Sequence, residues 1–155
     1  MENQDDDIYM IKPPAYKKRM DEYFMRVAKL TAELSYAQRK KVGAVLTKDF
    51  RICSIGFNGT PHSHNNCCED VLPDGSLVTK PNVIHAESNA IFWCAKSGIS
   101  TQGTTLYLTL SPCQTCSLAI IQAGIVRVVY GEQYRDDKGI EYLKSCGIVV
   151  EQLEI

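Results

Sequence analysis

The chain contains no apolar run approaching the roughly 18 to 20 residues that a membrane-spanning helix needs, and its charge has no dominant sign. Its 17 lysines and arginines are balanced by 18 aspartates and glutamates, which leaves a formal net charge of -1. DNA and tRNA are bound through strongly basic surfaces, so this balance indicates a small-molecule substrate and argues against a nucleic-acid polymer or a membrane as partner. Internal repeats and linkers are absent as well, which predicts one domain from the 155 residues.

Features of a secreted protein are also missing. The chain begins with the acidic, polar segment MENQDDD, whereas a secretory signal is basic and then apolar. Seven cysteines are an odd number for a disulfide framework, and without an export signal such residues more often bind a metal or take part in catalysis. We therefore expect a cytoplasmic protein, in the host cell if it is viral, with a flexible arm at residues 1–15 and one domain at 16–155.

The alternation of predicted helices and strands indicates the fold class. An amphipathic helix at 16–35 precedes two β-branched runs, 42–46 and 52–57, which predict a hairpin. The polar stretch 58–82 is expected to be an irregular, functional loop. The second half predicts helices at 85–96, 112–123 and 140–145 alternating with strands at 104–110, 125–130 and 148–151. Such alternation favours parallel pairing, so we expect an α/β fold of three αβα layers, with a five-stranded mixed sheet and helices on both faces.

Three residues with metal-binding side chains and one carboxylate form the central motif. His85 and Glu87 stand two apart, and Cys113 and Cys116 stand three apart after Pro112. Catalytic zinc usually takes three protein ligands and leaves its fourth position for water. The histidine and both cysteines fill the protein positions, so Glu87 is free to move protons. This H-x-E…P-C-x-x-C spacing is the signature of zinc-dependent nucleobase deaminases.

The spacing of His85 and Glu87 also makes a prediction about the backbone. On a regular helix, residues two apart face nearly opposite directions. Both side chains converge only if His85 has the non-helical backbone angles of a helix cap. The alternative is a structural zinc site, which needs a fourth protein ligand. The candidates for that ligand are His62, His64, Cys67 and Cys68.

Further segments resemble the deoxycytidylate (dCMP) deaminases of the cytidine deaminase superfamily, the phage forms in particular, over residues 16–151. The matching segments are KVGAV at 41–45, GFNGTP at 56–61, HAESNA at 85–90, LYLTLSPC at 106–113 and QAGI at 122–125. The zinc motif marks the superfamily, and GFNGTP with the loop after it narrows the resemblance to dCMP deaminases. The resemblance implies a cytidine deaminase-like fold and hydrolysis of dCMP to dUMP, which feeds thymidylate synthesis.

The resemblance also implies roles for single residues. Asn58 matches the family's asparagine that hydrogen-bonds the substrate sugar, although an Asn-Gly pair alone is equally typical of a turn. The backbone around Ala86 and Ser111 is implied to contact the cytosine edge. Tyr134 is implied to contact the ring or the phosphate of the substrate.

Assembly and regulation follow from the resemblance in the same way. Family members are typically hexamers that dCTP with magnesium activates and dTTP inhibits, with the effector held near the loop at 58–70 and a neighbouring subunit. On chemistry alone the candidate residues are equally a solvated helix face and a polar loop; they are Arg26, Lys29, Gly59, His62, Asn65, Glu69 and Asp70. Some phage members hold a second, structural zinc, for which Cys67 and Cys68 with His62 or His64 can supply ligands.

Other functions share parts of this pattern. A tRNA adenosine deaminase has the same core motif but needs a basic face. A free cytidine deaminase typically holds zinc with three cysteines, and riboflavin-pathway deaminases usually carry an added reductase domain. A non-enzymatic, zinc-stabilised binding module explains the three ligands but leaves Glu87 without a role. The resemblance therefore favours a dCMP deaminase with one catalytic zinc.

Overall fold

The computed structural model describes residues 12–155, so the predicted N-terminal arm lies largely outside the described part. Within residues 12–155, helix α2 (Pro14–Ala32) comes first and includes the last two residues of the predicted arm. No helix of residues 12–155 has the length and apolar character needed to span a membrane. The elements that follow are β1 (Gly43–Lys48), β2 (Arg51–Phe57), β3 (Glu69–Val71), β4 (Leu77–Thr79), α3 (Ala86–Ser97), β5 (Thr105–Leu110), α4 (Gln114–Gln122), β6 (Arg127–Glu132), α5 (Lys138–Ser145) and β7 (Val149–Gln152).

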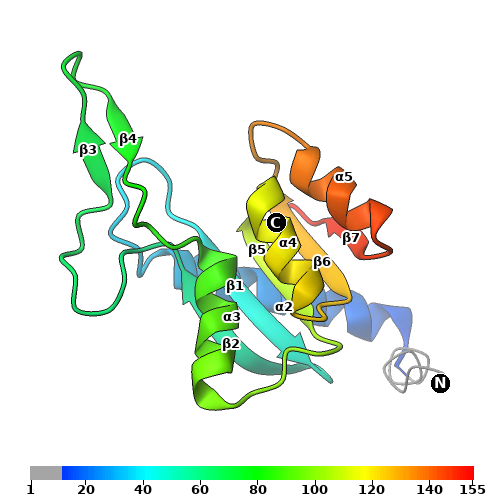
Figure 1. Cartoon of the computed structure of the whole chain (residues 1–155). Helices are drawn as coiled ribbons and strands as arrows, with labels where there is room; N and C mark the ends of the chain where they lie inside the picture. Colours follow the sequence, from blue (N-terminus) through cyan, green and yellow to red (C-terminus); the bar gives the residue numbers. More distant parts are fainter. Residues whose placement is uncertain (1–11) are drawn as a thin grey trace.

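Five of the strands form one mixed sheet in the order β2-β1-β5-β6-β7 (Figure 1). Strand β1 pairs antiparallel with β2 and with β5, whereas β5, β6 and β7 run parallel. The parallel pairs are connected through α4 and α5, because parallel neighbours need a crossover connection. The predicted α/β class and five-stranded mixed sheet are confirmed.

Alternation along the strands divides the core into two layers. Val45, Tyr107 and Val129 point to one face, where they pack against Phe24 and Met25 of α2. Their neighbours in the strands point to the other face and pack beneath α3, α4 and α5. The residues of that second cluster include Ala44, Leu46, Leu106, Leu108 and Val128 from the sheet and Ala90, Ile120 and Leu143 from the helices. Helices therefore cover both faces, as the three-layer prediction requires.

Two glycines let helices approach the sheet closely. A Cβ atom on Gly43 would lie 1.9 Å from the carbonyl oxygen of Ala28 in α2. A Cβ atom on Gly56 would lie 2.3 Å from the carbonyl oxygen of Ala86, the first residue of α3. Both distances are far inside van der Waals contact, so a side chain at either position would push a helix away. Gly56 thereby fixes where α3 begins, next to His85.

The polar stretch predicted to be irregular contains a second, separate hairpin. Strands β3 and β4 pair antiparallel and project away from the rest of the chain (Figure 1). Their turn is made by Asp74, whose carboxylate accepts hydrogen bonds from the backbone N–H and hydroxyl of Ser76, and by Gly75 with φ +83°. The prediction was wrong for residues 69–79 because strands of three residues carry too little alternation to stand out from a loop.

Candidate active site

The metal-binding motif lies at the starts of α3 and α4. His85 is the N-cap of α3 with φ -70° and ψ 156°, and Cys113 is the N-cap of α4 with φ -72° and ψ 167°. Both residues thus have extended backbone angles, which confirms the prediction made for His85. Helix α4 begins at Gln114, two residues later than predicted, so Pro112 precedes its cap. The two caps bring side chains 28 residues apart in the sequence to one point.

Three ligand atoms converge at that point. His85 Nδ1 lies 3.3 Å from Cys116 Sγ and 3.8 Å from Cys113 Sγ. Tetrahedral zinc with sulfur and nitrogen ligands separates such atoms by about 3.6 to 3.8 Å, so the set fits this metal. Within residues 12–155 it is the one group of three or more potential ligands whose atoms all lie within 4.8 Å of one another. The candidates for a second or four-ligand site, His62, His64, Cys67 and Cys68, are not brought together in this way.

Contacts within this cluster shift the pKa values of its ionisable groups. Hydrogen bonds with Cys116 and His85 lower the pKa of Cys113 to about 4. The same contact with Cys113, together with burial, raises the pKa of Cys116. The hydrogen bond with Cys113 also raises the pKa of His85 against the effect of burial. These opposite shifts favour the thiolate form at Cys113, which is the form in which cysteine binds a metal.

Glu87 lies in the first turn of α3, directly beside the three ligands. Its side chain is buried, and this burial raises the pKa of its carboxyl group, although the nearby His85 opposes the shift. It is not a member of the group whose atoms converge. Burial of this kind favours the protonated form of the carboxyl group relative to an exposed glutamate. Glu87 thus lies next to the three converging residues without belonging to their group, and its assignment as the acid–base residue stays a prediction.

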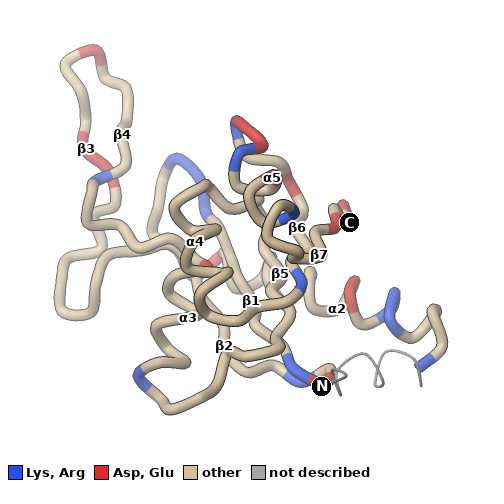
Figure 2. The backbone as a smooth tube through the Cα atoms, turned by 45° about the vertical axis from the view of Figure 1, so that its right-hand side comes forward, with Lys and Arg blue, Asp and Glu red and all other residues tan. Residues whose placement is uncertain are grey.

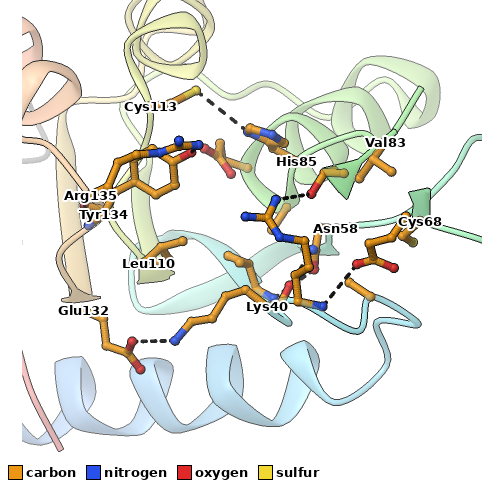
Figure 3. A pocket seen from close by; sticks show the side chains of 18 of the residues that line it. Lys40, Asn58, Cys68, Val83, His85, Leu110, Cys113, Glu132, Tyr134 and Arg135 are labelled. Carbon is orange, nitrogen blue, oxygen red and sulfur yellow. Dashed lines mark hydrogen bonds and ion pairs between the residues drawn. The ribbon is translucent and has the colours of Figure 1, made fainter. Parts of the chain in front are cut away.

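A cavity of about 500 Å³ opens beside the cluster (Figure 3). His85, Glu87 and Cys113 line it, whereas Cys116 lies behind them and is buried. The four residues predicted to contact substrate also line this cavity; they are Asn58, Ala86, Ser111 and Tyr134. Its volume is that of a site for a small molecule such as a nucleotide.

Asn58 is held rigidly at the end of β2. Its side-chain Oδ1 accepts the N–H of Val42 at 2.8 Å, and its Nδ2 donates to the carbonyl of Lys40 at 2.9 Å. These bonds use one donor and one acceptor, so the amide keeps one of each for a ligand. The Asn-Gly pair is therefore more than a turn, since its side chain joins two segments at the wall of the cavity.

Ser111 and Tyr134 are also linked to each other. The backbone N–H of Tyr134 donates to Ser111 Oγ at 2.7 Å, and the backbone N–H of Ser111 donates to the carbonyl of Glu132. These bonds continue the alignment of β5 and β6 beyond the ends of both strands. They position Tyr134 at the carboxyl end of the parallel strands, the edge where α/β folds bind ligands.

Four charged residues of the cavity were missed by the sequence reasoning: Arg39, Lys40, Glu132 and Arg135. The run of three basic residues at 39–41 just before β1 was a usable signal, because that segment leads directly to the cavity. Charged residues at the carboxyl end of a parallel strand, as at the end of β6, were a second signal. Neither group of charged residues is apparent from the overall composition, since the whole chain is almost neutral.

The predicted effector residues of α2 make contacts of their own. Arg26 pairs with Glu22 at 3.9 Å, one helical turn away. Lys29 donates to the carbonyl oxygen of Ile155 near the C-terminus. Figure 2 shows α2 on the side of the sheet opposite α3 and α4. Within one chain these two residues are therefore not part of the cavity at the metal-binding motif.

The effector residues predicted in the loop have partners within this chain, some local and some distant in the sequence. Glu69 is buried, and its Oε1 accepts the backbone N–H groups of Gln38 and Arg39 at 2.9 and 3.2 Å. Asp70 pairs with Lys80 at 3.6 Å across the small hairpin. Gly59 forms backbone hydrogen bonds with Ile84, and Asn65 accepts hydrogen bonds from other residues of the loop. The side chain of His62 is exposed. Glu69 thus anchors the segment that leads into β1.

Comparison with known proteins identifies the family. The family described as "Cytidine and deoxycytidylate deaminase zinc-binding region" matches residues 18–132. Deoxycytidylate deaminase of Saccharomyces cerevisiae is 36% identical over 145 residues, which cover 90% of this chain and 46% of the yeast protein. Deoxycytidylate deaminase of phage T4 is 34% identical over 165 residues, which cover 81% of this chain and 86% of the phage protein.

A solved structure has a similar fold. The dCMP deaminase of cyanophage S-TIM5, in complex with dCMP and dUMP, is 43% identical to this chain with a TM-score of 0.80, covering 92% of this chain and 99% of the cyanophage chain. Fold and site define the class of protein as a deaminase with a His-Cys-Cys metal-binding motif. The chain belongs to the cytidine and deoxycytidylate deaminase family.

Proposed function

We propose that this chain is a zinc-dependent enzyme that hydrolyses dCMP to dUMP and ammonia, and that the dUMP supplies thymidylate synthesis. The observation that carries the proposal is the three-ligand cluster of His85, Cys113 and Cys116 with a buried, unligated Glu87 beside it at the wall of a nucleotide-sized cavity. The relatives in yeast, phage T4 and cyanophage S-TIM5 bear the name of this activity and support the choice of substrate.

The mechanism uses Glu87 as the group that transfers protons. His85, Cys113 and Cys116 would hold zinc, which would supply a water molecule of lowered pKa. Glu87 takes a proton from the attacking water and delivers it to N3 of the cytosine ring. The oxygen of the water forms a bond to C4, and the C4–N4 bond then breaks. The second proton of the water passes through Glu87 to the departing amine, so one water is consumed and one ammonia is released.

The rest of the cavity holds the nucleotide. We assign the free donor and acceptor of Asn58 to the 3′-hydroxyl of the sugar, and the backbone around Ala86 and Ser111 to the polar edge of the cytosine ring. Tyr134 closes the opposite wall against the ring or the phosphate. The basic residues Arg39 and Arg135 line the same cavity, which suits an anionic substrate.

A panel of substrates tests this function. We expect dCMP to be deaminated with kcat/KM about 100-fold above that of deoxycytidine, because charge-assisted contacts to the phosphate are lost with the nucleoside. CMP is expected to react more slowly than dCMP, and adenosine not at all. Ultraviolet absorbance follows each reaction directly. Preferential turnover of adenosine would place the chain with the adenosine deaminases, and turnover of none of the four would favour a zinc-stabilised binding module.

We further propose that the chain assembles into a homo-oligomer, a hexamer, and that it acts in the cytoplasm. The oligomer is supported by large apolar side chains on the outer faces of adjoining helices, Phe92 and Trp93 on α3 and Leu118 on α4, each about half exposed. The cytoplasm is supported by the seven free cysteines, which suit a reducing compartment.

Regulation by nucleotides forms the last part of the proposal. We expect dCTP with magnesium to activate the enzyme and dTTP to inhibit it, with the effector contacting Arg26, Lys29 and the loop at 58–70 from two different subunits. The separate contacts of these residues within one chain agree with a site completed by a neighbour. Initial rates against dCMP concentration, with and without each effector, measure this. Superimposable curves would remove the regulatory proposal and leave the deaminase assignment in place.

A further inference from the structure

One ion pair lies at the end of the cavity away from the metal-binding cluster. Lys40, in the segment before β1, places its Nζ 2.5 Å from Oε2 of Glu132, the last residue of β6. Both residues line the cavity, and their side chains are 49% and 66% exposed. Figure 3 shows His85 and Cys113 at one end of the cavity and the Lys40–Glu132 pair at the other, with Asn58 between them.

The Lys40–Glu132 pair lies on the side of the cavity where we expect the 5′ end of the substrate. This step rests on the proposed function, in which the base lies at His85 and Glu87 and the sugar at Asn58. The Asn58 amide donates to the backbone carbonyl of Lys40, so Lys40 directly adjoins the residue assigned to the sugar. The 5′ substituent of a nucleotide bound in this direction extends from the sugar toward the wall that carries Lys40.

The charges at this wall distinguish Lys40 from the other basic residues. Arg39 donates to the hydroxyl of Thr79 at 3.1 Å, and the guanidinium of Arg135 lies 4.9 Å from the ring centre of Tyr134. Lys40 instead contacts the carboxylate of Glu132 at the end of β6. A phosphate monoester carries up to two negative charges and three acceptor oxygens, so it competes with a single carboxylate for an exposed ammonium group.

We propose that Lys40 binds the 5′-phosphate of the substrate and that Glu132 is a stand-in anion, which holds the ammonium group until the phosphate displaces it. An exposed ion pair is weak, so its exchange for a phosphate contact costs little. The same carboxylate repels an incoming nucleotide whose phosphate does not reach Lys40. The pair therefore sets the preference for nucleotides over nucleosides without touching the reacting atoms.

The test compares the ratio of kcat/KM for dCMP to kcat/KM for deoxycytidine among variants. Lys40→Met is expected to lower this ratio about tenfold, because one exposed charge-assisted contact to the phosphate is lost. Glu132→Gln is expected to raise it about twofold to fivefold by freeing the ammonium group. The matched control is Lys41→Met, an exposed lysine at the next position that does not line the cavity, and it should leave the ratio unchanged.

Combining the substitutions tests the exchange itself. If Glu132 acts by holding Lys40, the gain from Glu132→Gln shrinks in the Lys40→Met background. An equal gain in both backgrounds, or an unchanged ratio in Lys40→Met, overturns the inference. Calorimetric binding of dUMP and 2′-deoxyuridine to the same variants gives the ratio independently of turnover. Wild-type protein that neither deaminates dCMP nor binds dUMP removes the proposed function; normal wild-type activity with an unaffected Lys40→Met ratio removes this inference alone.

Discussion

Substitution of Glu87 by glutamine is expected to lower the turnover of dCMP by about 10³-fold or more while one zinc ion per chain stays bound. Glutamine has nearly the same size and keeps hydrogen-bonding atoms at a buried position, so the start of α3 should keep its shape. What it lacks is the ability to accept a proton from water and to release it again. Both the protonation of N3 and the departure of ammonia depend on that exchange.

Two measurements on the same sample decide this prediction. Steady-state kinetics gives the loss of kcat, and elemental analysis gives the zinc content per chain. The control is Glu141→Gln, the same chemical change at an exposed position of α5, which should alter neither quantity. Loss of zinc together with activity would make Glu87 a ligand, and activity within a few-fold of wild type would remove it from the mechanism.

The sequence predicted those parts of the site in which the spacing of the functional residues constrains the local backbone. A histidine and a glutamate two residues apart can serve one site only across a helix cap, and the angles at His85 confirm this. Cys113 and Cys116 had to share one face of a helix start for the same reason. The sheet could equally be predicted from the sequence, because side chains of β1, β5 and β6 alternate between two different core layers.

The parts that the sequence did not predict depend on side chains meeting over long separations. Lys40 and Glu132 are 92 residues apart, and no local pattern relates a basic run before one strand to the end of another. Asp21 is a charged residue of helix α2, yet it is buried against Arg127, 106 residues later in the sequence. The partner of a charged side chain can be assigned only once the order of the strands is known.

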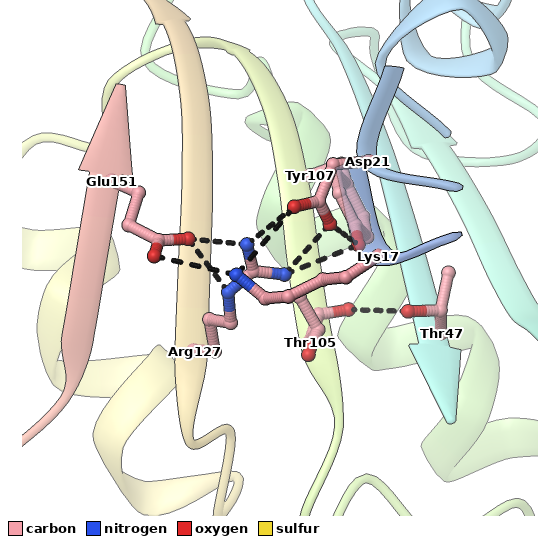
Figure 4. A network of polar contacts seen from close by, with 7 residues as sticks. All are labelled: Lys17, Asp21, Thr47, Thr105, Tyr107, Arg127 and Glu151. Carbon is pink, nitrogen blue, oxygen red and sulfur yellow. Dashed lines mark hydrogen bonds and ion pairs between the residues drawn. The ribbon is translucent and has the colours of Figure 1, made fainter. Parts of the chain in front are cut away.

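Asp21 and Arg127 are at the centre of a buried polar network between α2 and the sheet (Figure 4). Arg127 on β6 donates to both carboxylate oxygens of Asp21, at 2.8 and 2.7 Å, and its Nε donates to Glu151 at 2.8 Å. The hydroxyl of Tyr107 donates to Asp21 at 2.6 Å, and Lys17 lies 3.8 Å from the same carboxylate. Burial alone would raise the pKa of Asp21, but the bonds from Arg127 and Tyr107 outweigh it and lower that pKa.

Replacing Arg127 with methionine is expected to reduce the free energy of unfolding by about 3 to 5 kcal/mol, because a buried carboxylate loses its main partner. The control Arg51→Met, on the exposed edge strand β2, should change it by less than about 0.5 kcal/mol. Urea denaturation monitored by circular dichroism measures both. The double variant Asp21→Leu with Arg127→Met should be less destabilised than Arg127→Met, since it leaves no buried charge unpaired.

Because of the same network, the loss of stability in Arg127→Met should depend on pH in a defined direction. In the wild type the lowered pKa of Asp21 contributes stability that is present above the unfolded pKa and is lost as the pH falls through the folded pKa. Without Arg127, burial raises the folded pKa of Asp21, with Lys17 and Tyr107 as its remaining partners, and protonation then favours folding. The difference between wild type and Arg127→Met should therefore shrink as the pH falls from about 7 to about 4.5. A constant difference across that range would show that lost packing, and not the unpaired carboxylate, destabilises the variant.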